Sequence, residues 1–285
     1  MVRIAAAAYP IDWFDDFSQY QAKITRWVQD AEGADLLVFP EYGVMELASL
    51  GGREVAGDLE VSLHEVARHW DQVAALHQAL ARQHDCHILA ASGPVFEGAR
   101  PVNRAVLYGP DGLIGHQDKQ IMTRFEREEW DVVGAPGLRV FDTVLGRIGI
   151  LICYDSEFPL LGRVLAEAGV ELVLVPSCTD TVAGFSRVRI GAMARALESQ
   201  CVVVQAPTVG ACDWMPALDE NRGRAAIYGP PDGFWPETGI IAEGGMDQPG
   251  WVMAEIDVAR IANSRRDGAV LPFAHWPESG RPGLI

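Results

Sequence analysis

Two pairs of similar segments recur in the same order along the 285-residue chain. Residues 31–40 (AEGADLLVFP) resemble residues 166–176 (AEAGVELVLVP), and residues 104–112 (RAVLYGPDG) resemble residues 224–233 (RAAIYGPPDG). In each half, a helix leads into a buried strand and a hairpin follows. Two such α/β layers can bury their sheets face to face with the helices outside. The repeat predicts an α/β fold, a four-layer α-β-β-α sandwich with an internal pseudo-twofold repeat, as a single domain over residues 1–271.

The charge and the cysteine content argue against several kinds of partner. Acidic residues outnumber basic ones by 39 to 23, and the net charge of −16 argues against nucleic acid or an anionic membrane. No apolar run approaches a membrane span, and residues 1–5 resemble a strand, not a signal peptide. The five cysteines include no CxxC pair, which is typical of reduced thiols. We therefore expect a cytoplasmic protein.

A helix signal and several histidines coincide between residues 62 and 87. Ser62 and Glu65 have the spacing of a capping box, which predicts a helix beginning there with Trp70 and Leu80 on one face. The histidines show no HExxH or other compact ligand spacing, so we expect surface or helix-boundary positions and neither metal nor cofactor. They are His64, His69, His77, His84 and His87.

Three polar side chains stand just after predicted strands. They are Glu41 after residues 35–39, Lys119 after residues 113–117 and Cys153 after residues 149–152. Functional sites of open α/β sheets gather beyond the carboxyl ends of strands. A thiol at its free pKa is a few per cent thiolate at neutral pH, so a nucleophilic cysteine needs a base or a cation nearby. Glu41 can accept the thiol proton, while Lys119 and the backbone N–H of Tyr154 can stabilise an oxyanion.

Cys178 is the rival nucleophile, because it also follows a predicted strand. No lysine or histidine lies close to it in sequence, which favours Cys153. Ser177, Cys178 and Thr179 are candidates for substrate binding. Asp155 and Glu157 could be catalytic, but local hydrogen bonding and a pair with Arg163 are the preferred interpretation for them.

Five motifs occur in an order that resembles the nitrilase (carbon–nitrogen hydrolase) superfamily, in its amidase-like branch. They are FPE at 39–41, Lys119 with FER at 125–127, CYDSEFPLLGR at 153–163, GVELVLVPS at 169–177 and ARALE at 194–198. The resemblance covers nearly the whole chain and implies an α-β-β-α sandwich and a Glu-Lys-Cys triad. It makes Glu41 the general base, Lys119 the oxyanion stabiliser and Cys153 the nucleophile. It also implies a second glutamate, for which Glu126 fits best and Glu128 is the alternative.

The resemblance implies a hydrolase that cleaves the non-peptide C–N bond of a small linear amide, with water and through a cysteine thioester. Tyr154-Asp155 after the cysteine favours an amide, since true nitrilases typically have Trp-Glu there. Hydrolysis of a carbamoyl amide or a nitrile, acyl transfer to an amine, and a non-catalytic ligand-binding role remain alternatives, and the acyl group is not specified. The resemblance further implies a homodimer or higher homo-oligomer, with the apolar, proline-rich tail at 272–285 at a subunit interface.

Overall fold

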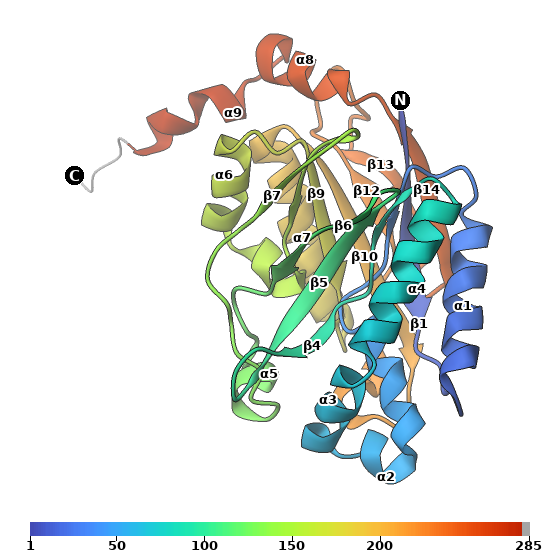
Figure 1. Ribbon diagram of the computed structural model, residues 1–285. Coiled ribbons are helices and arrows are strands. Elements are labelled where there is room, and N and C mark those ends of the chain that lie inside the picture. The colour runs from blue at the N-terminus through green and yellow to red at the C-terminus, as the bar shows by residue number, and fades with distance from the viewer. Residues whose placement is uncertain (281–285) are drawn as a thin grey trace.

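The computed structural model describes residues 1–280 and arranges the strands in two sheets (Figure 1). The first contains, in spatial order, β14 (Gly250–Ile256), β1 (Val2–Pro10), β2 (Leu36–Val38), β3 (His87–Leu89), β5 (Pro101–Gly109) and β6 (Gly112–Asp118), with β4 (Gly93–Phe96) paired to β5. The second contains β7 (Val140–Thr143), β8 (Gly146–Ile150), β9 (Leu172–Ser177), β10 (Val202–Ala211), β12 (Ala226–Tyr228) and β13 (Ile240–Glu243), with β11 (Glu220–Asn221) paired to β10. A short parallel pairing of β1 with β10 joins the two sheets.

The two sheets repeat one pattern of strand directions. From β14 to β6, successive neighbours pair antiparallel, parallel, parallel, antiparallel and antiparallel, and the same series runs from β7 to β13. The similar segments occupy equivalent places in the two sheets. Residues 31–40 contain β2 and residues 166–176 contain most of β9, and each of these strands is third in its series. Residues 104–112 contain the turn after β5 and residues 224–233 the turn after β12, and each of these strands is fifth. The predicted internal repeat is therefore confirmed in the strand order.

Alternating side chains of the strands divide the apolar interior into layers. In β1, Ile4 and Ala6 belong to the core shared with β8, β9 and β10, whereas Ala5 and Ala7 pack toward the helices of the first half. Helices α1 (Phe17–Asp30), α3 (Leu59–Ala67) and α4 (Trp70–Gln83) cover the first sheet, and α6 (Pro159–Glu167) and α7 (Val182–Ser199) cover the second (Figure 1). This arrangement confirms the α-β-β-α sandwich.

Shorter helices connect these layers. They are η1 (Gly43–Gly51), α2 (Arg53–Ala56), α5 (Arg124–Glu128), η2 (Cys153–Glu157), η3 (Pro216–Leu218), α8 (Ala259–Asp267), α9 (Pro272–His275) and η4 (Trp276–Gly280). The predicted tail at 272–285 thus contains two short helices as far as Gly280, and its last part, residues 281–285, lies outside the described residues. Along residues 1–280, we find no helix with the length and hydropathy needed to span a bilayer.

The capping-box prediction at Ser62 is wrong. Asp58 is the N-cap, its side chain accepting hydrogen bonds from the N–H groups of Glu60 and Val61, so α3 begins at Leu59. The chain then breaks before a second helix, α4. His77 is a core residue and not a surface one. Its Nδ1 donates to the Val73 carbonyl of its own helix, its ring stacks on Tyr108, and burial lowers its pKa to about 4.

Candidate active site

Glu41 is positioned by the abrupt end of β2. Pro40 cannot donate a ladder hydrogen bond, and its carbonyl accepts from Ser92 N–H, which ties this segment to the chain after β3. Tyr42 then adopts a left-handed conformation, with φ of 54°, and turns the chain into η1. The Glu41 side chain is left buried, only 1 % exposed, at the carboxyl end of the strand.

Cys153 lies at a strained turn after β8. Leu151 still donates to Leu174 of the neighbouring strand, but Cys153 has a φ of 48° and begins η2. A positive φ is uncommon for a residue with a side chain, and such strain is often found at functional sites. The Cys153 Sγ lies 3.6 Å from the carbonyl oxygen of Cys178, and the N–H of Tyr154 follows at the start of the turn, where backbone donors of a helix lack intrahelical acceptors.

Lys119 follows β6 and joins two buried carboxylates. Its Nζ lies 2.7 Å from Oε1 of Glu41 and 2.8 Å and 2.7 Å from the two oxygens of Glu126. The Cys153 thiol lies close enough for the charge of Glu41 to raise its pKa. The structure therefore brings together all four predicted catalytic side chains, and they line one cavity of about 650 Å³.

Of the two candidates for the second glutamate, Glu126 is the one that contacts Lys119, and Glu128 is not. Thr123 and Glu126 form a capping box at the start of α5, so Glu126 Oε2 accepts from the Thr123 N–H at 2.8 Å and from its hydroxyl at 2.9 Å. The hydroxyl of Tyr42 donates to the other oxygen at 2.8 Å. Glu128 instead lies on the exposed face of α5 and pairs with Arg124.

Burial and charge give the four groups different proton affinities. Burial raises the pKa of Glu41 to about 7, although Lys119 acts in the opposite direction. Burial also opposes the charged form of Glu126, but Lys119 and the donors from Thr123 and Tyr42 outweigh it and hold the pKa of that carboxyl below its usual value. Burial and the nearby Glu41 raise the pKa of Cys153, whereas Glu126 and Glu41 hold the pKa of Lys119 well above its usual value despite burial. Near neutral pH, Cys153 is therefore a thiol, Lys119 is a cation and Glu126 is ionised. Glu41 is close to the pH at which it titrates.

The remaining candidates lie around the same cavity or beneath it. Cys178 and Thr179 line the cavity, with Cys178 Sγ 3.5 Å from Asn221 Oδ1 and its pKa raised by burial. Ser177 is buried and is not among the lining residues.

The expected pairing of Asp155 and Glu157 with Arg163 is not observed. Arg163 pairs with Glu167, while Glu157 pairs with Arg187 at the cavity. The Asp155 carboxylate accepts hydrogen bonds from backbone N–H groups beyond Lys119, at Gln120 and Ile121. It therefore connects two parts of the site instead of acting locally.

Three residues that contact Glu41 or Glu126 were not predicted from the sequence. They are Tyr42, Asn103 and Thr123. The Thr123-x-x-Glu126 spacing is a capping-box signal that could have revealed Thr123. No local pattern marks Tyr42 or Asn103, because their contacts with Glu126 and Glu41 join residues that are 84 and 62 positions apart.

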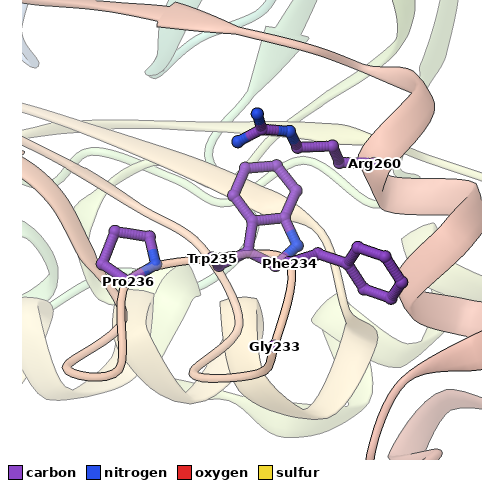
Figure 2. A pocket seen from close by; sticks show the side chains of 5 residues that line it. All are labelled: Gly233, Phe234, Trp235, Pro236 and Arg260. Carbon is purple, nitrogen blue, oxygen red and sulfur yellow. The ribbon is translucent and has the colours of Figure 1, made fainter.

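A second hollow, of about 440 Å³, lies between the loop before β13 and α8. Figure 2 shows Arg260 extending over the indole of Trp235, between Phe234 and Pro236. Its lining residues include no thiol, carboxylate or lysine, so this hollow lacks the groups for covalent catalysis. In the part of the chain that the structure describes, no three His, Cys, Asp or Glu side chains are grouped so as to hold a metal ion.

Comparisons with known proteins give consistent results. The family described as "Carbon-nitrogen hydrolase" matches residues 3–266. The chain is 30% identical to "Probable hydrolase YhcX" of Bacillus subtilis over 94% of its own length and 52% of that protein, so it spans about half of that relative. It is 33% identical to the (R)-stereoselective amidase of Pseudomonas sp., covering 83% of this chain and 78% of the amidase. The crystal structure of Saccharomyces cerevisiae Nit3, a member of branch 10 of the nitrilase superfamily, has the same fold, with a TM-score of 0.71, 21% identity and 93% of each chain covered.

Proposed function

Because the chain belongs to the carbon–nitrogen hydrolase family, we propose that it hydrolyses the C–N bond of a small linear amide, with Glu41, Lys119 and Cys153 as its catalytic triad. The observation that carries the proposal is the buried contact of Lys119 Nζ with Glu41 Oε1, at 2.7 Å, beside the Cys153 thiol in one cavity. A base, a cation and a nucleophile in this arrangement meet the geometric needs of acyl transfer. Family membership itself confirms the resemblance seen in the sequence.

In the first half of the proposed reaction, an acyl group is transferred to Cys153. The thiol proton passes to Glu41 as sulfur attacks the amide carbon, and the carbonyl oxygen becomes an oxyanion. Lys119 and the Tyr154 N–H stabilise that oxyanion. Glu41 then gives its proton to the departing nitrogen, the C–N bond breaks, and ammonia or an amine leaves a thioester on Cys153.

In the second half, water cleaves the thioester. Glu41 accepts a proton from the water as its oxygen attacks the acyl carbon, and the same donors stabilise the second oxyanion. As this intermediate collapses, the C–S bond breaks and the carboxylic acid is released, and Glu41 returns its proton to the sulfur of Cys153. Glu126 does not need to exchange a proton in either half, because its role is to hold Lys119 in place and to balance its charge.

An amide is the preferred substrate for two reasons. The 33% identical relative is an amidase, and Tyr154-Asp155 follows the nucleophile in this chain. The cavity of about 650 Å³ is large enough for a small substrate. Six charged side chains line it beyond the proposed catalytic groups: Arg124, Glu157, Asp180, Arg187, Asp219 and Glu220.

Ammonia release from a panel of small amides tests the activity, with Cys153→Ala as the matched inactive variant. Wild-type turnover that is absent in the variant supports the proposal. Faster turnover of carbamoyl amides or nitriles would change the substrate class, and formation of a new amide in the presence of an amine would indicate acyl transfer. Binding of amides by the wild-type protein without turnover would identify a non-catalytic ligand-binding protein.

Alkylation tests the identity of the nucleophile. With limiting iodoacetamide, Cys153 should be labelled first and activity should be lost in proportion, because Glu41 takes the proton of this thiol in the proposed reaction. Cys178 is also affected by the charges of Glu41 and Lys119, but its thiol donates to Asn221 Oδ1 instead. Cys178→Ala should keep its activity. Preferential labelling of Cys178, together with inactivity of Cys178→Ala, would identify Cys178 as the nucleophile instead of Cys153.

We also propose that the chain forms a homodimer or higher homo-oligomer, with residues 1–271 as one domain and the tail at a subunit interface. Apolar side chains are exposed along α6 and α7, at Leu160, Val164, Val182, Ile190 and Leu197. The five cysteines are all free, which supports a reducing compartment such as the cytoplasm.

A further inference from the structure

Asn103 contacts two members of the proposed triad without lining the cavity. It lies on β5, opposite Lys119 at the end of β6, and it is fully buried. Its Nδ2 lies 3.0 Å from Glu41 Oε1, and its backbone carbonyl accepts from the Lys119 N–H at 2.9 Å. Asn103 therefore contacts both the side chain of Glu41, the proposed base, and the backbone of Lys119, the proposed oxyanion stabiliser.

The two donors to Glu41 converge on one oxygen. Asn103 Nδ2 and Lys119 Nζ both reach Oε1, at 3.0 Å and 2.7 Å. A carboxylate with one oxygen held by two donors from fixed elements has little freedom to rotate. Its second oxygen, Oε2, receives neither of these two donors, which leaves it free to accept the thiol proton in the proposed reaction.

The amide of Asn103 is not explained by packing alone. Its Oδ1 is buried and has no hydrogen-bond partner among the described residues, and such an unpaired acceptor destabilises a folded protein. Rotating the amide by half a turn would place Oδ1 against the Glu41 oxygen, where two acceptors would repel each other. The donor orientation is therefore the one that fits, and its only side-chain partner here is Glu41.

We infer that Asn103 is a positioning residue that orients the Glu41 carboxylate and favours its ionised form, so that Oε2 can accept the proton of Cys153. The inference rests on the proposed triad and adds a member that does not touch the substrate. Its role resembles that of the third group in a nucleophile–base–orienter arrangement, which holds the base and does not itself exchange protons.

The experiment compares Asn103→Leu, which keeps the approximate size and removes the donor, with Gln205→Leu. Gln205 is an equally buried amide, but it bonds to the hydroxyl of Tyr228 in the second sheet and touches no member of the triad. Asn103→Leu should lower kcat and kcat/KM together by about 10- to 100-fold, the effect of one hydrogen bond to a charged group, with KM nearly unchanged. Its acidic limb in the pH profile of kcat/KM should move to higher pH, because the ionised carboxylate has lost a donor.

The control separates positioning from stability. Gln205→Leu should lower the melting temperature without moving the pH profile. Equal shifts of the profile in both variants, or an unchanged profile in folded Asn103→Leu, would overturn the inference. Asn103→Ala, which adds no bulk, provides the same test if the leucine variant does not fold.

A second readout keeps this inference separate from the proposed activity. The rate of Cys153 alkylation by iodoacetamide depends on pH through the same carboxylate and needs no substrate. If no amide is hydrolysed, the proposed function fails, while a shifted alkylation profile in Asn103→Leu still supports the role of Asn103. If the wild-type enzyme is active and its alkylation profile is identical to that of Asn103→Leu, the role of Asn103 is overturned while the proposed function stands.

Discussion

Two glutamates share one lysine in this site, but their environments give them different proton affinities. Glu126 receives two donors from Thr123 and one from Tyr42 in addition to Lys119, so it remains ionised. Glu41 is equally buried but receives fewer donors, and its pKa rises to about 7. A group that titrates near neutral pH can both accept and return a proton, which is the property a general base needs. Burial and Glu41 raise the pKa of Cys153, so in the proposed mechanism the thiolate forms during the reaction and is not the resting state.

The pH dependence of activity should follow Glu41. It must be ionised to accept the thiol proton, so kcat/KM should fall as the pH drops through about 7. Folding raises this pKa, so the folded protein should also lose stability as the pH rises through the same value, and Glu41→Gln should reduce that loss. A kcat/KM profile that is flat from about pH 5 to pH 8 would contradict the assignment.

Substitution of each glutamate by glutamine should affect different steps. Glu41→Gln removes the base, so it should slow turnover by about 10²- to 10⁴-fold and leave little acyl-enzyme. Glu126→Gln loosens Lys119 but keeps the base, so some acyl-enzyme should form while complete turnover slows. Intact-mass measurement after mixing with substrate distinguishes the two. Ready accumulation in Glu41→Gln, with none in Glu126→Gln, would reverse the roles.

At the scale of elements, the site is assembled where β2, β6 and β8 end. Each strand delivers one side chain of the proposed triad, and contacts between the strand ends hold these side chains in place. One such connection is Asp155 of η2, whose carboxylate accepts from the N–H groups of Gln120 at 3.1 Å and Ile121 at 2.9 Å. It joins the turn that carries Cys153 to the segment that follows Lys119.

Loss of this connection should reduce both stability and activity. Asp155→Ala leaves two backbone N–H groups without their acceptor, which should cost about 1–3 kcal/mol in the free energy of unfolding. Activity should fall as well, because Lys119 is no longer held against the Cys153 turn. Asp142→Ala is the matched control, since Asp142 is an exposed aspartate that pairs with Arg147 outside the site. Thermal unfolding and kcat/KM measured together test the prediction, which fails if both variants behave alike.

At the scale of the whole molecule, the two pseudo-equivalent halves differ in their outer helices. In the described part of the chain, α1 and α4 expose none of the large apolar side chains and α3 exposes one, Val61 at 45%. In contrast, α6 and α7 expose several, with Leu160 at 73% and Ile190 at 65%. The fold repeat does not require this difference. An apolar face on one half is typical of a surface that another molecule covers, which supports the proposed self-association.

Charged substitutions on this face should separate the subunits. Val164→Asp and Ile190→Asp place carboxylates where apolar contact is expected, so each should shift the mass measured by light scattering toward that of a monomer. Val144→Asp is the control, because Val144 is 92% exposed in the turn between β7 and β8. A wild-type protein that is monomeric at micromolar concentration would contradict the proposal, as would equal dissociation by the control.

The sequence by itself determined the architecture and the places of the principal site residues. Its repeated segments correspond to equivalent strands, and the family match confirms the resemblance. Glu41, Lys119 and Cys153 could be located because each follows a strand, and strand ends gather at one edge of a sheet. These are local signals, readable from periodicity and from the residues at which it stops.

Only the tertiary structure decided which side chains meet. Glu126 and Glu128 lie on one short helix, and packing turns the first toward Lys119 and the second toward solvent. Asn103 contacts Glu41 from a strand that is distant in sequence. Asp58, and not Ser62, is the N-cap of α3, because its side chain accepts from the free N–H groups at the start of that helix. The shifted pKa of Glu41 likewise arises from burial together with two charges contributed by other segments. Such properties depend on distances across the fold, which the local pattern of a sequence does not contain.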